Sequence, residues 1–214
     1  MDEDITVINT TTRNEKIKNF FIKNKKKLVI LLSLIILLIL SYFAYGEFDK
    51  RSKIKIANKY NNSIINFISG DKLNVESEMI KIINAKDKTY SPLALYFLLD
   101  NNFINSKEKI NSLFDILINE TKVDKEINNL IIYKKALYNS EFETENNLLK
   151  ILNPVINSES IWKSHGLYLM AEYFLSKNEK QKSKEFFEKI LILENSNPQV
   201  KLEAQKRIQR DFSE

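Results

Sequence analysis

The sequence predicts an all-α protein with one transmembrane helix near its N-terminus, followed by stacked pairs of antiparallel helices. Residues 28–45, LVILLSLIILLILSYFAY, contain no charge, proline or glycine. The whole chain holds only three glycines and three prolines, and all of them follow this run. Apolar residues beyond the run recur at helical spacing, without the alternation typical of strands. We therefore expect three parts: a basic tail over 1–27, a membrane span over 28–45 and a helical domain over 46–214.

As a helix, the run 28–45 is about 27 Å long, close to the roughly 30 Å hydrocarbon thickness of a bilayer. Two alternatives are a buried helix of a soluble core and a cleaved signal peptide. A core helix rarely runs this far without a charge. The segment 1–27 is long for the start of a signal peptide. Tyr42, Phe43 and Tyr45 are typical of an aromatic belt at one membrane interface rather than of a cleavage site.

Basic residues predict the orientation of the span. Lys25, Lys26 and Lys27 precede it directly, whereas the first charges after it are Glu47 and Asp49. By the positive-inside rule the N-terminus lies in the cytoplasm and the domain over 46–214 lies across the membrane.

Composition argues against nucleic acid as a partner. The net charge of +5 and the pI of 9.1 owe much to residues 1–27, which hold seven basic and four acidic side chains. The remaining charge is mixed in sign, as on an ordinary solvated surface. The chain has no cysteine, so a disulfide framework is excluded.

The polar segment 1–14 is expected to lack regular structure. Thereafter we expect helices over 57–70, 73–84, 92–102, 105–119, 124–139, 140–153, 158–177, 179–194 and 198–212. The first has an apolar stripe of Ala57, Tyr60, Ile64 and Ile68.

Capping signals predict several helix starts. They are Ser91 before Pro92, Asn105 with Glu108, Ser140 with Glu143, either Ser158 or Ser160, and Asn197 before Pro198. Asn153 and Pro154 are expected to end the sixth of these helices.

The clearest repeat unit spans 164–197 and resembles a tetratricopeptide repeat of about 34 residues. Its first helix carries the large, large, small, aromatic pattern and its second the small, aromatic, apolar pattern. The residues are Leu167, Met170, Ala171 and Phe174, then Ser183, Phe187 and Ile190. A poorer copy contains Tyr133, Ala136, Phe142 and Leu149, and 92–119 is a third, degenerate pair. We therefore expect a TPR-like α-solenoid.

A wider resemblance covers 20–212. The lead-in Phe20-Phe21-Ile22, the single span, the Gly70-Asp71 turn, the Ser91-Pro92 helix start and the degenerate repeats resemble the bacterial tetratricopeptide-like family of ancillary SecYEG translocon subunits. The resemblance implies an inner-membrane protein with a periplasmic repeat domain. It implies two partners, the SecYEG channel and a membrane-anchored periplasmic chaperone of prolyl-isomerase ancestry. It carries no catalytic residues.

The sequence contains few residues in patterns typical of catalytic or metal-binding sites. The single histidine, His165, has no cysteine partner that would indicate a metal site. Glu141, Glu143 and Glu145 lie around an expected helix start, where carboxylates offset the helix dipole. No phosphate loop, nucleophile elbow or paired acid motif is present. We expect no enzymatic activity, no metal and no cofactor.

Repeat solenoids bind extended peptides or partner helices on the surface formed by the first helix of each pair. In the last repeat that surface would include His165, Tyr168, Glu172, Leu175 and Ser176. Tyr168 fits a partly buried core position equally well. We expect a membrane-anchored protein-binding module that assists exported polypeptides at the translocon. The alternative is a structural tether or assembly scaffold of another cell-envelope complex.

Overall fold

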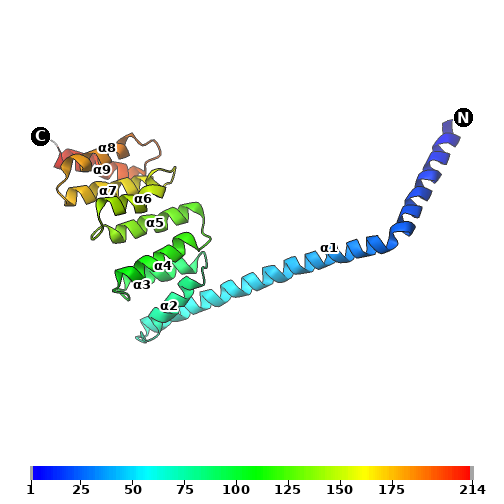
Figure 1. Cartoon of the computed structure of the whole chain (residues 1–214), viewed down its shortest axis with the longest axis horizontal. Helices are drawn as coiled ribbons and strands as arrows, with labels where there is room; N and C mark the ends of the chain where they lie inside the picture. The colour runs from blue at the N-terminus through cyan, green and yellow to red at the C-terminus, as the bar shows by residue number, and fades with distance from the viewer. Residues whose placement is uncertain (1, 213–214) are drawn as a thin grey trace. The chain divides into compact units, whose positions relative to one another are not determined.

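The computed structural model describes residues 2–212, with side chains from residue 14 onward. All regular secondary structure in these residues is helical. The helices are α1 (Asp2–Ile68), α2 (Val75–Asn84), α3 (Tyr90–Asp100), α4 (Lys107–Asn119), α5 (Lys125–Asn139), α6 (Glu145–Ile156), α7 (Lys163–Ser176), α8 (Lys180–Ile192) and α9 (Pro198–Asp211) (Figure 1). The chain divides into two compact units, Met1–Lys55 and Ile56–Glu214, and α1 contributes to both.

The first unit contains the apolar run. Its most apolar 18-residue window has a mean hydropathy of 2.7, and none of that window is buried. The hydroxyls of Ser33 and Ser41 donate to the carbonyls of Val29 and Leu37, at 2.9 and 2.8 Å, so these polar groups are satisfied within the helix. The helix is therefore long and apolar enough to span a membrane.

The start of α1 differs from expectation. The segment 1–14 was expected to be irregular, but the backbone is helical from Asp2; Met1 lies outside the described residues. No proline or glycine occurs before Gly46. Nothing in the covalent chain therefore interrupts the helix between Asp2 and the apolar run.

The second unit is a stack in which each helix from α2 to α9 follows its neighbour in chain order (Figure 1). Its core consists of three successive clusters. The first joins α2, α3 and α4 with Ile131 of α5, the second joins α5, α6 and α7, and the third joins α7, α8 and α9. A core extended along a stack, with each element packed mainly on its neighbours, is the hallmark of repeat-like helical folds.

The last turns of α1 belong to this second unit. Tyr60, Ile64 and Phe67 pack against the first cluster, and the ring of Phe67 meets Phe97 of α3 edge-on at 5.1 Å. Ile68, expected on the same stripe, is 76% exposed. A step of four residues advances a helix by about 400°, so two steps carry position 68 roughly 80° away from position 60. Gly70, with φ of +91°, ends the helix as expected.

Helix α9 starts where the sequence predicts. The side chain of Asn197 accepts hydrogen bonds from the backbone N–H groups of Gln199 and Val200, and Pro198 occupies the first turn. Three other predicted starts are displaced. Helix α7 begins at Lys163, later than the expected Ser158 or Ser160. Ser106, not Asn105, caps α4, and Thr144, not Ser140, caps α6. In the last two cases a hydroxyl residue one or four positions later takes the position whose oxygen accepts from the free N–H groups.

Ser91 and Pro154 have roles other than those expected. Ser91 lies inside α3, where its buried hydroxyl donates to the carbonyl of Ile82 on α2 at 2.7 Å. The carboxylate of Asp87 instead accepts from the N–H groups of Thr89 and Tyr90 at the start of α3. Pro154 does not end α6, which continues to Ile156. The missing proline N–H removes one hydrogen bond, but the following residues keep the helical path.

Asparagine replaces glycine at two helix ends. Asn102 and Asn178 follow α3 and α7 with φ of 52° and 62°. The next N–H groups, of Phe103 and Glu179, reach back to the carbonyls of Leu98 and Phe174 at 3.0 and 2.9 Å. This is the six-to-one hydrogen bond of a Schellman motif. Asparagine tolerates the left-handed conformation, which is how a glycine-poor chain ends these helices.

A polar pair crosses the interface between α4 and α5. The side-chain amides of Asn111 and Asn139 exchange two hydrogen bonds of 3.0 and 2.8 Å. Asn139 is buried, and its amide also donates to the carbonyl of Lys135. Lys135 in turn pairs with Asp115 at 2.7 Å across the same interface.

Candidate functional site

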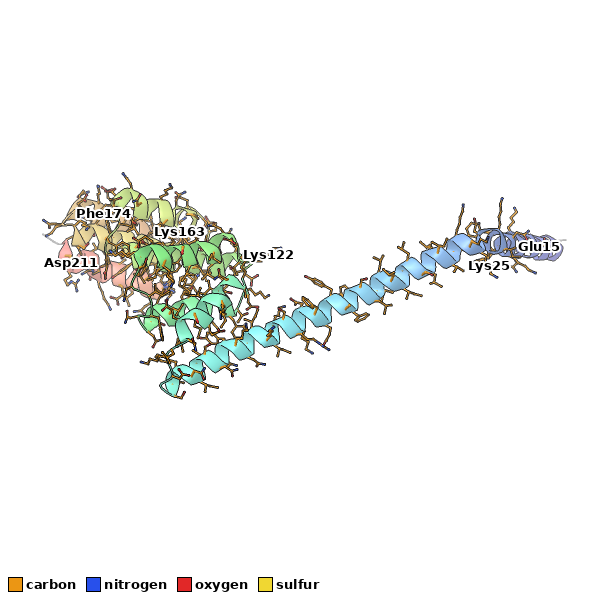
Figure 2. The ribbon with its side chains drawn as sticks, turned by 60° about the horizontal axis from the view of Figure 1, so that its bottom comes forward. Glu15, Lys25, Lys122, Lys163, Phe174 and Asp211 are labelled. Carbon is orange, nitrogen blue, oxygen red and sulfur yellow. The ribbon has the colours of Figure 1, made fainter. Side chains whose placement is uncertain are left out.

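The residues assigned to repeat packing are buried. Leu167 and Ala171 on α7 pack in one cluster with Phe187 and Ile190 on α8. Met170 and Phe174 belong to the cluster shared with α5 and α6, and Ser183 is fully buried. The hydroxyl of Ser183 donates to the carbonyl of Ala171 at 2.8 Å. Such a contact requires a close approach of the two helix backbones, which small side chains permit. Figure 2 shows Phe174 within the packed part of the stack.

The face of α7 that carries Tyr168 and Glu172 is in contact with α9. The guanidinium of Arg207 binds the carboxylate of Glu172 through two hydrogen bonds of 2.7 and 2.5 Å. The ring of Tyr168 meets Phe187 edge-on at 5.4 Å. Burial raises the pKa of Tyr168, and the nearby charge of Glu172 raises it further. Glu172 thus binds the last helix, and Tyr168 packs against α8.

His165 points to a different neighbour. Its ring lies 5.8 Å from that of Tyr133 on α5 and 5.0 Å from that of Trp162, which precedes α7. Its Nδ1 is buried and has no hydrogen-bond partner. Burial lowers the pKa of His165, because a charged imidazolium loses hydration between the two rings.

The remaining candidates lie at the end of α7. Leu175 is half-buried, and Ser176 is exposed with its hydroxyl donating to the carbonyl of Tyr173. The structure therefore brings Tyr168 and Glu172 together, and sets His165 apart toward α5. The five residues do not line one open surface.

A pocket of about 370 Å³ lies between α3 and α5. Its apolar wall includes Pro92, Leu93, Ile127 and Leu130. Leu93 is 41% exposed and Ile127 is 42% exposed, so apolar side chains of both helices face solvent across the pocket. This arrangement can accept an apolar side chain from a partner.

Polar residues also line this pocket, namely Lys88, Thr89 and Asp124. Tyr96 lines it, and the phenolic oxygen of this residue is buried without a hydrogen-bond partner. Burial raises the pKa of Tyr96 to about 12, so the hydroxyl stays protonated at neutral pH. The ammonium of Lys134 lies 5.3 Å from the centre of the Tyr96 ring. The pocket thus combines an apolar wall with one unsatisfied hydroxyl.

Sequence reasoning missed this pocket, although a signal was present. The α3 sequence YSPLALYFLLD has a single charged residue, at its end. A helix that is apolar all round is expected to be buried all round. The exposure of Leu93 therefore marks a face of α3 that this chain leaves uncovered.

No group of three or more His, Cys, Asp or Glu residues that could hold an ion occurs within 14–212. Glu145 pairs with Lys182 at 2.8 Å, in a role that links α6 to α8. Comparison of the chain with protein-family models, with curated proteins and with solved structures finds no match.

Proposed function

We propose that this chain is a membrane-tethered, TPR-like module that binds polypeptide segments on the face formed by α3 and α5. The observation that carries the proposal is the uncovered apolar pocket containing Leu93 and Ile127. The close contact of Ala171 with Ser183 supports the TPR-like pairing of α7 and α8. On that pairing α5 is the first helix of the preceding pair, the helix that faces ligands in such repeats, whereas α3 packs mainly on α2.

A partner segment would insert an apolar side chain between Leu93 and Ile127 and offer a hydrogen-bond acceptor to the hydroxyl of Tyr96. A single pocket of this kind gives modest affinity; a dissociation constant near 1 µM corresponds to about 8 kcal/mol. A membrane anchor would raise the effective concentration near other membrane proteins. The resemblance noted in the sequence supports the SecYEG channel and a membrane-anchored periplasmic chaperone as the partners, with exported polypeptides as clients.

The test is cross-linking in intact cells followed by purification of the full chain in mild detergent. Replacing both Leu93 and Ile127 with serine should abolish recovery of the channel and the chaperone. The matched control replaces Leu137 and Leu202, which are 44% and 45% exposed and lie outside the pocket, and should retain both partners. Equal recovery by the two double variants would reject the pocket and favour a plain scaffold.

Orientation is part of the same proposal. Because the chain has no cysteine, a single introduced cysteine reports on one position only. Asn195→Cys, at an exposed site, should react with an impermeant maleimide in intact spheroplasts. Thr12→Cys should react only after lysis. The opposite labelling pattern would place the helical domain in the cytoplasm.

A further inference from the structure

A second hollow, of about 640 Å³, lies between α6 and α8 and is bounded by the start of α7. Its apolar lining includes Leu149 and Ile156 from α6, Leu167 from α7, and Phe186 and Ile192 from α8. Ile192 is 81% exposed, which leaves this edge of the cleft open to solvent. None of these residues belongs to the α3–α5 pocket, so this cleft is a separate surface of the same unit.

Two lysines stand at the cleft. Lys163 and Lys189 both line it, and the ammonium of Lys189 lies 4.4 Å from the centre of the Phe186 ring. Among the described side chains, no ion pair reaches either ammonium, whereas Lys182 on the same helix as Lys189 pairs with two glutamates. Glu185 and Glu188 line a neighbouring hollow that shares Lys189 and Ile192 with the cleft, but neither glutamate forms an ion pair with Lys189.

The start of α7 adds to this positive potential. Lys163 is the first residue of the helix, and the first turn contains no acidic residue. The N-terminal end of a helix carries a partial positive charge, so a lysine there is electrostatically unfavourable and a nearby anion is stabilising. Figure 2 labels Lys163 on the surface of the stack. An apolar floor and two lysines that form no ion pair among the described side chains therefore occur together in one cleft.

We propose that the cleft binds an amphipathic helix of a partner protein, with its apolar side chains on the floor and its carboxylates at Lys163 and Lys189. The cleft follows α6 and its C-cap from Leu149 to Asn157, eight residue steps or about 12 Å. This length fits two turns of a helix, whose anchors at i, i+4 and i+7 lie along one side. The charge of the rim selects glutamate or aspartate on the flanks of that apolar stripe.

The probe is a fluorescent helical peptide of about 16 residues with leucine at i, i+4 and i+7 and glutamate on both flanks. A second peptide carries glutamine in place of every glutamate. Binding of both is measured by fluorescence anisotropy with the full chain in nanodiscs of zwitterionic lipid, which avoids detergent in the cleft. The glutamate peptide should bind about fivefold more tightly at low salt, and this difference should shrink at high salt.

Variants locate the contact. Replacing both Lys163 and Lys189 with glutamine should remove the preference for the glutamate peptide. Replacing Lys150 and Lys180, which are exposed lysines outside the cleft, should leave the preference intact. Ile192→Ser should weaken both peptides, because it shortens the apolar floor without disturbing a buried side chain.

Three results would overturn the proposal. They are equal affinity for the two peptides, equal losses in the two lysine double variants, and binding of oleate without binding of peptide, which would indicate an acyl ligand. The double replacement of Leu93 and Ile127 should leave peptide affinity unchanged. The proposal for the cleft can therefore be supported even if binding at the α3–α5 pocket is rejected, and the reverse is also true.

Discussion

Arg207 on α9 donates hydrogen bonds from both Nε and Nη2 to the two carboxylate oxygens of Glu172 on α7, at 2.7 and 2.5 Å. A two-point contact of this kind depends on the planar guanidinium, which lysine cannot reproduce. The side chain of Arg207 is only 19% exposed, so the pair is partly shielded from water. The contact fixes the last helix on the stack.

We predict a coupling energy of about 1 kcal/mol between these two residues, because the pair is bidentate and half-buried. Thermal unfolding of Glu172→Gln, Arg207→Lys and the double variant, each in the full chain, measures it as a double-mutant cycle. Strict additivity would mean that the pair contributes nothing to stability. The same cycle at exposed Lys206 and Glu203 is the control and should couple more weakly.

Replacing Ala171 with phenylalanine should lower the free energy of unfolding by about 1–3 kcal/mol, because the new ring has no space where α7 and α8 meet. Lys177→Phe, at an exposed position of the same chain segment, should cost less than about 0.5 kcal/mol. Chemical unfolding of both variants checks this. Equal costs would show that α7 and α8 are paired in another register.

Gly166→Ala tests the approach of α6 to α7. A Cβ at this position would lie 2.9 Å from Cγ2 of Ile156, a branch close to the backbone that cannot swing away freely. Alanine gains about 1 kcal/mol of helix propensity over glycine, and overpacking costs about 1–3 kcal/mol. We expect a net loss of stability in thermal unfolding. Adding Ile156→Ala should make the Gly166→Ala change stabilising; a variant that remains unstable would point to another cause.

Asn178→Gly should raise the free energy of unfolding by about 0.5–1 kcal/mol, because glycine adopts the observed φ of 62° without a steric penalty. Asn178→Ala should lower it, since alanine lacks the local hydrogen bonds that help asparagine at this conformation. Thermal unfolding ranks the three proteins. An alanine variant as stable as the glycine variant would show that α7 ends in another conformation.

Stability should fall as pH drops below about 6.5, the unfolded-state pKa of histidine. Burial lowers the pKa of His165 in the folded state. Between the two pKa values the unfolded chain binds the extra proton, so acid favours unfolding, and above the unfolded value the full stability is present. His165 is the only histidine. Its replacement by glutamine should flatten the dependence of the melting temperature on pH between about pH 5.5 and 7. An unchanged slope would exclude His165 as the cause.

The all-helical class and most helix positions were predictable because periodicity, proline and asparagine act locally. Asn197 before Pro198 is a complete start signal, and the structure contains it. Ser91 before Pro92 carries the same signal, but the hydroxyl of Ser91 serves a tertiary contact with Ile82. Nothing within the α3 segment distinguishes these two outcomes.

The candidate site was harder to predict because it depends on what each helix face meets. Repeat spacing placed Tyr168 and Glu172 on the ligand-facing side of α7, but spacing does not reveal that Arg207, 35 residues later in the chain, faces Glu172. The α3–α5 pocket arises from the spacing of two helices, and the exposure of Leu93 is a property of that spacing.

The amide pair of Asn111 and Asn139 also determines how α4 and α5 are aligned. Apolar side chains tolerate sliding by one helical turn, since leucine packs acceptably on isoleucine at either position. Two amides that hydrogen-bond to each other do not tolerate such sliding. A shift of about 5.4 Å would leave a buried donor and acceptor without partners. At the interface of α4 and α5, this pair therefore disfavours the shifted arrangements that hydrophobic packing alone would allow.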